Sequence, residues 1–217
     1  MNPQRKFPSI IGIGAGGHCK VVMEIIHRMG TWKIAGLLDA NPARKGELFS
    51  GVEILGTDDL ISTLLEQGRQ TAFVGIGSTV PSSRRQNAFA MLRNLGFELP
   101  VLIHPSATVA GDVIIGSATT IMPGAIVNPG ARIGECVIIN SGSVIEHDCE
   151  ISAFAHISPG AVLGGSVHVG TGAHVGIGAV VRQGIRIGNH ALIGAGAVVI
   201  KDVADGSKVM GVPAREF

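Results

Sequence analysis

The adjacent residues His147 and Asp148 have the types expected of a general base and the acid that orients it. Histidine is ionisable near neutral pH and is a common general base in acyl transfer. A neighbouring carboxylate can polarise the imidazole and fix its tautomer. The alternative is that His147 is an exposed turn residue without a catalytic role. The pair therefore predicts acyl transfer with His147 as the base.

Gly165 follows His147 by 18 residues. If 18 residues make one coil of a stacked structure, Gly165 lies one strand spacing away, at about 5 Å. A glycine there would leave room for a thioester carbonyl, and its N–H could stabilise the oxyanion. No serine or cysteine nucleophile arrangement is evident, so direct transfer is expected.

A second candidate site is the glycine loop Gly12-x-Gly14-x-x-Gly17. It follows an apolar segment at 9–13 and precedes a helical pattern from His18 to about Met29, so its N–H groups could bind a pyrophosphate. Asp39, after a predicted strand at 34–38, could accept hydrogen bonds from a ribose or base. The alternative is a tight turn without a ligand. The domain is too short to contain the second mononucleotide-binding half that NAD requires. A nucleotide diphosphate fits the available length better.

The elements that position His147 are predicted by a six-residue register. Strands separated by tight turns explain this period, and three hexads make an 18-residue coil. An ordinary β-sandwich gives no reason to keep one register this long. The aliphatic positions are Val109, Ile115, Ile121, Val127, Ile133, Ile139, Ile145, Ile151, Ile157, Leu163, Val169, Val175, Val181, Ile187, Ile193 and Val199.

Each aliphatic position has a mostly small residue two places before it and often Gly or Asn directly after it, as in Gly164 and Asn128. We expect the aliphatic side chain to point inward, the small one to fill the corner, and the Gly or Asn to adopt the turn conformation. This pattern predicts a left-handed parallel β-helix, an exception to the usual right-handed crossover.

The residues before the β-helix alternate between strand and helix patterns. Strands are predicted at 9–13, 34–38, 71–76 and 98–103, and helices at 18–29, 58–67 with Asp58 as N-cap, and 81–95. Alternation of this kind favours a small Rossmann-like parallel sheet. The predicted domains are a Rossmann-like domain at 1–104, which carries the candidate nucleotide-diphosphate site, and the β-helix at 105–217, which carries the candidate acyl-transfer residues.

The composition excludes several classes of function. The 217 residues are 46% hydrophobic and 15% charged, with a net charge of +1 and no basic block, which disfavours nucleic-acid binding. No apolar run is long enough to span a membrane, and we interpret the N-terminal segment as a first strand rather than a secretory signal. Three scattered cysteines, Cys19, Cys136 and Cys149, favour reduced thiols and a cytoplasmic location.

Other histidines on the predicted coils raise the alternative of a zinc site, as in γ-class carbonic anhydrases. His156, His168 and His174 precede inward aliphatic residues and should face outward, and His156 and His174, 18 apart, should stack. A zinc site needs three converging ligands, and only one aligned pair is evident. We therefore expect no metal, a cofactor contact at His156, and surface positions for His168, His174 and His190.

Taken together, these segments resemble the NeuD/PglD-type sugar O- and N-acyltransferases, including the closely allied perosamine N-acetyltransferases. The resemblance covers the whole chain, and its specificity lies in the combination rather than in any single hexad. The matching segments are 14–18, 38–39, 75–77, 103–105, 140–148, 154–160 and 210–215.

The resemblance implies that His147 accepts a proton and that Asp148 raises its basicity. It implies acetyl-CoA as cosubstrate, and a homotrimer with active sites between subunits. Two positions depart from the pattern: Ala40 replaces an acid of some relatives, which puts the nucleobase in doubt, and Ala195 replaces a glycine. The implied nucleotide-sugar contacts are Gly16, Gly17, His18, Asp39 and Gly77, with Asn140 added from the matching segment. The implied acetyl-CoA contacts are His156, Ile177 and Ala195, beside Gly165.

The predicted function is acetyl transfer from acetyl-CoA to the amino group of a UDP- or GDP-linked 4-amino-4,6-dideoxy sugar, for polysaccharide or glycan biosynthesis. One alternative is O-acetylation of sialic acid or a related sugar. Another is a binding or scaffold β-helix with a vestigial site, which would not bind acetyl-CoA.

Overall fold

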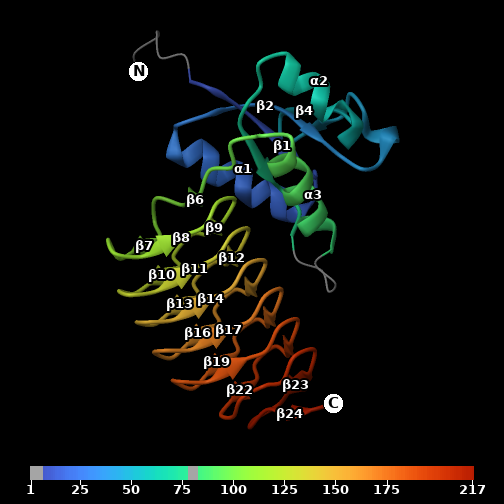
Figure 1. Cartoon of the computed structure of the whole chain (residues 1–217). Helices are drawn as coiled ribbons and strands as arrows, with labels where there is room; N and C mark the ends of the chain where they lie inside the picture. Colours follow the sequence, from blue (N-terminus) through green and yellow to red (C-terminus); the bar gives the residue numbers. More distant parts are fainter. Residues whose placement is uncertain (1–6, 78–82) are drawn as a thin grey trace. The chain divides into compact units, whose positions relative to one another are not determined.

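The computed structural model describes residues 7–77 and 83–217, which form two compact units divided between Pro100 and Val101 (Figure 1). The predicted boundary after residue 104 therefore lies four residues inside the second unit. The difference arises because the strand Leu102–Ile103 pairs with a strand of the β-helix.

The first unit is built on a five-stranded sheet with the order β3-β4-β2-β1-β5. Its strands are β1 (Ser9–Ile13), β2 (Lys33–Leu38), β3 (Leu48–Phe49), β4 (Val52–Gly56) and β5 (Ala72–Val74). Strands β4, β2, β1 and β5 are parallel, and β3 pairs antiparallel with β4 at the edge. The sequence did not lead us to expect the β3–β4 hairpin, because it lacks a clear alternating pattern.

The helices of this unit are α1 (Gly17–Met29), α2 (Ile61–Glu66) and α3 (Ser83–Asn94), with 3₁₀ turns η1 (Pro42–Arg44) and η2 (Asp58–Leu60). Helix α1 buries one apolar face that includes Val22, Ile25 and Ile26. It ends where Gly30 adopts the left-handed conformation that glycine tolerates best.

Two predicted elements of this unit differ from the structure. The segment 58–67 forms η2 followed by the shorter α2, and Thr57 rather than Asp58 occupies the N-cap position. The segment 98–103 contributes only a bridge between Glu98 and Thr71 before β6 begins. The start of the helix predicted at 81–95 lies outside the described residues.

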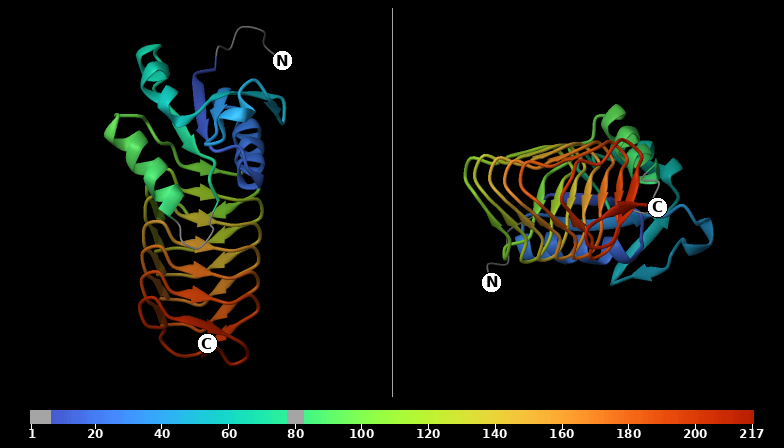
Figure 2. Two further views of the ribbon diagram at one scale, coloured as in Figure 1. Left: turned by 90° about the vertical axis from the view of Figure 1, so that its right-hand side faces the viewer. Right: turned by 90° about the horizontal axis from the view of Figure 1, so that it is seen from below.

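The second unit is the predicted left-handed parallel β-helix, with three sheets of strands that are two or three residues long (Figures 1 and 2). The first sheet contains β7 (Thr108–Val109), β10 (Ile126–Val127), β13 (Val144–Ile145), β16 (Val162–Leu163), β19 (Val180–Val181) and β22 (Val198–Val199). The second contains β8 (Ile114–Ile115), β11 (Arg132–Ile133), β14 (Glu150–Ile151), β17 (His168–Val169) and β20 (Arg186–Ile187). The third contains β6 (Leu102–Ile103), β9 (Thr120–Ile121), β12 (Ile138–Ile139), β15 (His156–Ile157), β18 (His174–Val175), β21 (Leu192–Ile193), β23 (Lys208–Met210) and β24 (Arg215–Glu216).

The coil length of 18 residues is confirmed by the strand pairing, in which Ile145 faces Val127 on one side and Leu163 on the other. The aliphatic and small positions both point into the coil and form one continuous core. Cys149 occupies one small position, and its thiol donates a hydrogen bond to the Gly164 carbonyl at 3.2 Å. The coil shortens only near the C-terminus, where Leu192 pairs with Lys208.

The explanation we gave for the glycines after the aliphatic positions is wrong. A Cβ added at Gly164 would lie 2.6 Å from the backbone nitrogen of Gln183 in the next coil, so close stacking excludes a side chain there. The left-handed conformation occurs two residues later in most hexads, for example at Ser166 and Asp148. Glycine therefore serves coil packing at the first position and backbone conformation at the second.

None of the helices within residues 7–77 and 83–217 combines the length and apolar character needed to cross a bilayer.

Candidate functional site

His147 and Asp148 occupy a corner of the β-helix, directly after β13, and both side chains are more than half exposed. His147 Nδ1 lies 2.8 Å from Asp148 Oδ2. Since a carboxylate has no proton to donate, Nδ1 carries the hydrogen and Nε2 keeps a free lone pair. This arrangement can accept a proton from a substrate at Nε2.

The backbone explains why the two side chains meet. Asp148 has a φ of 58°, in the left-handed region that Asp and Asn tolerate better than most residues. Its N–H donates to the Pro129 carbonyl of the preceding coil at 3.0 Å. The corner is therefore held by coil stacking, and the exposed pair is presented on a rigid element.

Gly165 lies against the imidazole, as the coil spacing predicted. A Cβ added there would be 2.5 Å from His147 Nε2 and 2.6 Å from Cε1. Within the described part of the chain no group accepts a hydrogen bond from the Gly165 N–H. The space beside Nε2 is thus open because residue 165 has no side chain.

His156, His174 and Asn140 form a polar cluster over the third sheet. His156 and His174 stack across β15 and β18 with ring centroids 4.6 Å apart, which confirms the predicted column. His156 faces out of the coil but is only 9% exposed, so it is more buried than an outward position suggests. Its Nε2 lies 3.1 Å from Asn140 Nδ2, and His174 Nε2 lies 2.8 Å from Ser158 Oγ.

Asn140 lies in the β-helix unit, beside His156 and apart from the lining of the cavity that holds the other predicted substrate contacts. His168 and His190 sit on other faces of the coil. Ile177 and Ala195 are exposed and lie one above the other at a third corner, where Gly196 N–H donates to the Ile177 carbonyl at 2.8 Å. Their roles as ligand contacts stay predictions.

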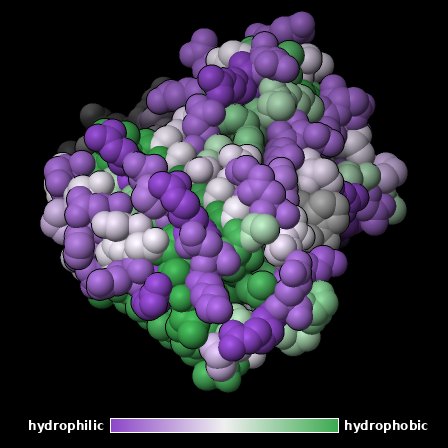
Figure 3. All heavy atoms as spheres, turned by 60° about the horizontal axis from the view of Figure 1, so that its bottom comes forward, coloured by the Kyte–Doolittle hydropathy of each residue, from purple (hydrophilic) through white to green (hydrophobic). Residues whose placement is uncertain are grey.

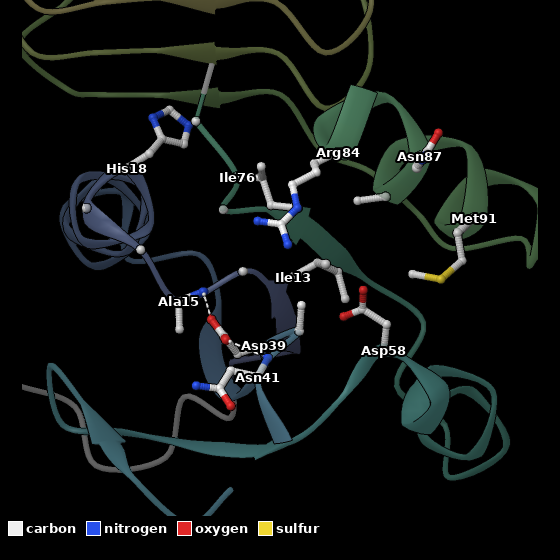
Figure 4. A pocket seen from close by; sticks show the side chains of 17 residues that line it. Ile13, Ala15, His18, Asp39, Asn41, Asp58, Ile76, Arg84, Asn87 and Met91 are labelled. Carbon is white, nitrogen blue, oxygen red and sulfur yellow. Dashed lines mark hydrogen bonds between the residues drawn. The ribbon is translucent and has the colours of Figure 1, made fainter. Parts of the chain in front are cut away.

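The glycine loop forms part of a cavity of about 750 Å³ in the first unit (Figure 4). The five sequence-predicted residues Gly16, Gly17, His18, Asp39 and Gly77 all line it. Gly77 approaches His18 closely, because a Cβ at Gly77 would lie 3.0 Å from the His18 Cβ. The loop begins α1, so its free N–H groups and the helix dipole favour an anion.

Asp39 has hydrogen bonds that the sequence did not predict. Its Oδ2 accepts from the Ala15 N–H at 3.0 Å and from Arg44 Nη1 at 3.0 Å, and its Oδ1 accepts from the Asn41 N–H at 3.1 Å. Arg44 Nη1 also donates to the Ala15 carbonyl, and the guanidinium pairs with Glu47. Asp39 therefore fixes the glycine loop, and spare acceptor capacity remains at Oδ1.

Two titratable groups in the lining have displaced pKa values. Burial, with help from the charge of Arg85, lowers the pKa of His18 to about 4, so this ring is neutral at neutral pH. Burial and the charges of Asp39 and Asp59 raise the pKa of Asp58, against an opposing effect of Arg84.

Sequence reasoning missed several cavity residues, namely Asn41, Asp58, Arg84, Asn87 and Met91. Arg84 is exposed, lies in the first turn of α3 and has no hydrogen-bond or ion-pair partner in residues 7–77 and 83–217. Figure 4 shows its guanidinium directed into the cavity near Ile76 and Ile13. No motif marks these residues, because helix α3 reaches the glycine loop only through the tertiary fold.

No group of three or more His, Cys, Asp or Glu side chains within the described ranges converges on a possible metal position.

Comparison with known proteins identifies the family. Residues 9–91 match the model of the PglD N-terminal domain, and residues 112–147 match the bacterial transferase hexapeptide model of six repeats. A histidine mutant of perosamine N-acetyltransferase from Caulobacter crescentus, solved with CoA and GDP-perosamine, is 38% identical with a TM-score of 0.91, and 96% of each chain is covered. The chain belongs to the NeuD/PglD-type sugar acyltransferase family.

A second similar structure is the acetyltransferase domain of PglB from Neisseria gonorrhoeae in complex with acetyl coenzyme A. It is 36% identical with a TM-score of 0.89, and the alignment covers 98% of this chain and 100% of that one. Among curated proteins, none matches. Family membership makes this chain an enzyme, a sugar acyltransferase with an N-terminal PglD-type unit and a hexapeptide β-helix.

Proposed function

We propose that this chain is an acetyl-CoA-dependent N-acetyltransferase that acts on a nucleotide-linked 4-amino-4,6-dideoxy sugar. The observation that carries the proposal is the oriented pair His147–Asp148, with Nδ1 2.8 Å from Oδ2 and Nε2 facing the space over Gly165. Relatives described with CoA, acetyl coenzyme A and GDP-perosamine support the same chemistry.

In the proposed reaction the sugar amine attacks the thioester carbonyl of acetyl-CoA. His147 Nε2 takes the proton from the amine, and Asp148 stabilises the resulting imidazolium through Nδ1–H. The Gly165 N–H donates to the carbonyl oxygen as negative charge develops on it. The carbon–sulfur bond then breaks, the His147 imidazolium gives its Nε2 proton to the leaving sulfur, and the products are CoA as the thiol and the acetamido sugar.

The cavity of the first unit holds the nucleotide in this proposal. The glycine loop and the first turn of α1 bind the diphosphate through backbone N–H groups. Arg84 supplies a positive charge opposite the loop, and the neutral His18 adds no charge of its own. A nucleotide sugar thus has a polar site of sufficient volume at about 750 Å³.

The acetyl-CoA site extends over the first sheet of the β-helix. A groove of about 460 Å³ there is lined by Val162, Gly164, Val180 and Arg182, among others. Along each coil this sheet lies between the corner that carries Ile177 and Ala195 and the corner that carries His147 and Gly165. A long cofactor laid across it would connect the two predicted sets of residues, while His156 contacts it from the third sheet.

The same sheet supports a homotrimer with active sites between subunits. From β10 onward its outward positions are apolar, whereas those of the second sheet include Arg132, Glu150, His168 and Arg186. Apolar side chains also gather between polar ones on the surface toward the C-terminal coils (Figure 3). A second subunit would cover this apolar face and deepen the groove. The outward apolar residues of the first sheet are Ile126, Val144, Val162, Val180 and Val198.

The proposed substrates, a nucleotide sugar and acetyl-CoA, place the reaction in the cytoplasm, within surface polysaccharide or glycan biosynthesis. The three cysteines are buried and form no disulfide within residues 7–77 and 83–217, which is compatible with a reducing compartment.

The test is CoA-thiol release from acetyl-CoA with UDP- and GDP-linked 4-amino-4,6-dideoxy sugars and with free sialic acid. We expect turnover with a nucleotide amino sugar, and a loss of roughly 100-fold or more in His147→Ala with acetyl-CoA binding retained. Turnover with sialic acid alone would indicate the O-acetyltransferase alternative, and failure to bind acetyl-CoA would indicate a scaffold. Near-normal turnover in His147→Ala would remove this histidine from the mechanism.

A further inference from the structure

Asp58 is a carboxylate in the cavity that no described group hydrogen-bonds. Its Oδ1 is buried without a hydrogen-bond partner, and the residue is part of the cavity lining. The neighbouring Asp59, by contrast, is exposed, lies outside the lining and accepts a hydrogen bond from Thr57 Oγ1. A buried acceptor without a donor is costly unless a ligand supplies one.

The strand order tells what part of a nucleotide would meet this carboxylate. The glycine loop follows β1, Asp39 follows β2 and Asp58 follows β4, and these three strands are neighbours in that order. Two strand spacings separate the first from the last, which is about 10 Å. A diphosphate at the glycine loop thus puts the ribose over the end of β2 and the base over the end of β4.

The surroundings of Asp58 suit a flat heterocycle. Figure 4 shows its carboxylate directed into the cavity, with Ile13 and Met91 on either side of it in this view. These apolar side chains can pack on the faces of a ring, while the Asn87 amide from α3 adds a polar group. Residue 40 is an alanine, so the cavity has no second acidic side chain directly after Asp39 in the sequence.

We propose that Asp58 binds the nucleobase and selects guanine, so that the sugar that accepts the acetyl group is GDP-linked. The inference rests on the proposed function. A carboxylate accepts but cannot donate, and guanine presents two adjacent donors, N1–H and the exocyclic amine. Uracil presents one N–H between two carbonyl oxygens, which a carboxylate repels. The carboxyl torsion χ2 is soft, so both oxygens can turn toward the base.

Binding of GDP, UDP and inosine diphosphate to the full-length protein, measured by calorimetry, tests this role without requiring turnover. Inosine diphosphate differs from GDP only in lacking the exocyclic amine. We expect GDP to bind roughly 10- to 100-fold more tightly than UDP, and more tightly than inosine diphosphate, the range for hydrogen bonds to a charged group. Asp58→Asn should lose most of both preferences, chiefly by weakening GDP, and Asp59→Asn should keep them.

Equal or tighter binding of UDP by the wild type would overturn the inference and leave the proposed acetyltransfer intact. An equal loss of all three nucleotides in Asp58→Asn would also overturn it, since Asp58 would then support the cavity rather than read the base. Absence of binding by any of the three would overturn the nucleotide site itself. If Asp58→Asn does not fold, the relative affinities of the wild type for GDP, UDP and inosine diphosphate still test the inference.

Discussion

Gly165 lies so close to the imidazole of His147 that a Cβ on it would be 2.5 Å from Nε2. Gly165→Ala should therefore displace the ring and lower kcat by roughly 10- to 100-fold, because small misplacements of a catalytic group are costly. The backbone at Gly165 does not need positive φ, so the variant should keep its fold. Steady-state kinetics with thermal unfolding as a parallel readout would check this.

Gly111→Ala is a matched control for this variant. Gly111 is also on the β-helix without positive φ, and a Cβ there would meet no atom within 4 Å. It should have wild-type kcat. Equal activity in both alanine variants would mean that the ring adapts and that close approach at Gly165 is irrelevant to catalysis.

The hydrogen bond from His147 to Asp148 gives a second prediction. In Asp148→Asn the side-chain amide can donate to Nδ1 and would stabilise the tautomer with hydrogen on Nε2, which cannot accept a proton. We expect kcat to fall roughly 100-fold or more while KM for acetyl-CoA changes little. Asparagine tolerates the left-handed φ of 58° at this corner, so the variant separates chemistry from folding.

Asp112→Asn controls for loss of a corner carboxylate. Asp112 lies at the same corner two coils before Asp148, but its Oδ2 accepts a hydrogen bond from the Gly130 N–H rather than from His147, so its variant should turn over normally. A fall in kcat shared by both variants would point to the stability of the corners rather than to the tautomer.

The β-helix and the corner that carries His147 were predictable because they depend on a local repeat. A fixed period of 18 residues determines which residues stack, and so Gly165 could be assigned to His147, and Ile177 to Ala195, from spacing alone. The role of the glycine after each aliphatic residue was misinterpreted. The sequence shows that glycine recurs at this position, but it does not show whether a positive φ or a close neighbour in the next coil is the reason.

The cavity of the first unit was only half predictable. The glycine loop and Asp39 belong to a local strand–loop–helix pattern, whereas Asp58 and Arg84 reach the cavity through the tertiary fold. The partners of Asp39 were not foreseen either, because Arg44 lies in a 3₁₀ turn that no periodic pattern marks. Long-range side-chain contacts of this kind leave no spacing rule in a single sequence.

Arg84 should contribute to substrate affinity more than to the chemical step. Arg84→Ala removes a cavity guanidinium without a protein partner in the described residues, and we expect KM for the nucleotide sugar to rise roughly 10-fold with kcat nearly unchanged. The effect should shrink at high salt because the interaction is electrostatic. Initial rates against substrate concentration at two ionic strengths would measure it.

Arg93→Ala is the comparison on the same helix. Arg93 lies outside the cavity lining and stacks over Phe89, so its loss should leave KM unchanged. A fall in kcat with unchanged KM in Arg84→Ala would contradict a binding role.

His18 should make folding stability depend on pH in the mildly acidic range. Burial lowers its pKa from 6.5 to about 4, so below pH 6.5 the unfolded chain takes up a proton that the folded chain resists. Stability from this group is complete above the unfolded pKa and falls as the pH drops from 6.5 toward 4. Between pH 7 and pH 5 the loss should be at most about 2 kcal/mol. Urea unfolding of the wild type and His18→Gln at both pH values isolates the effect, since the other histidines are common to both proteins. An equal loss in the two proteins would mean that His18 is not kept neutral by the fold.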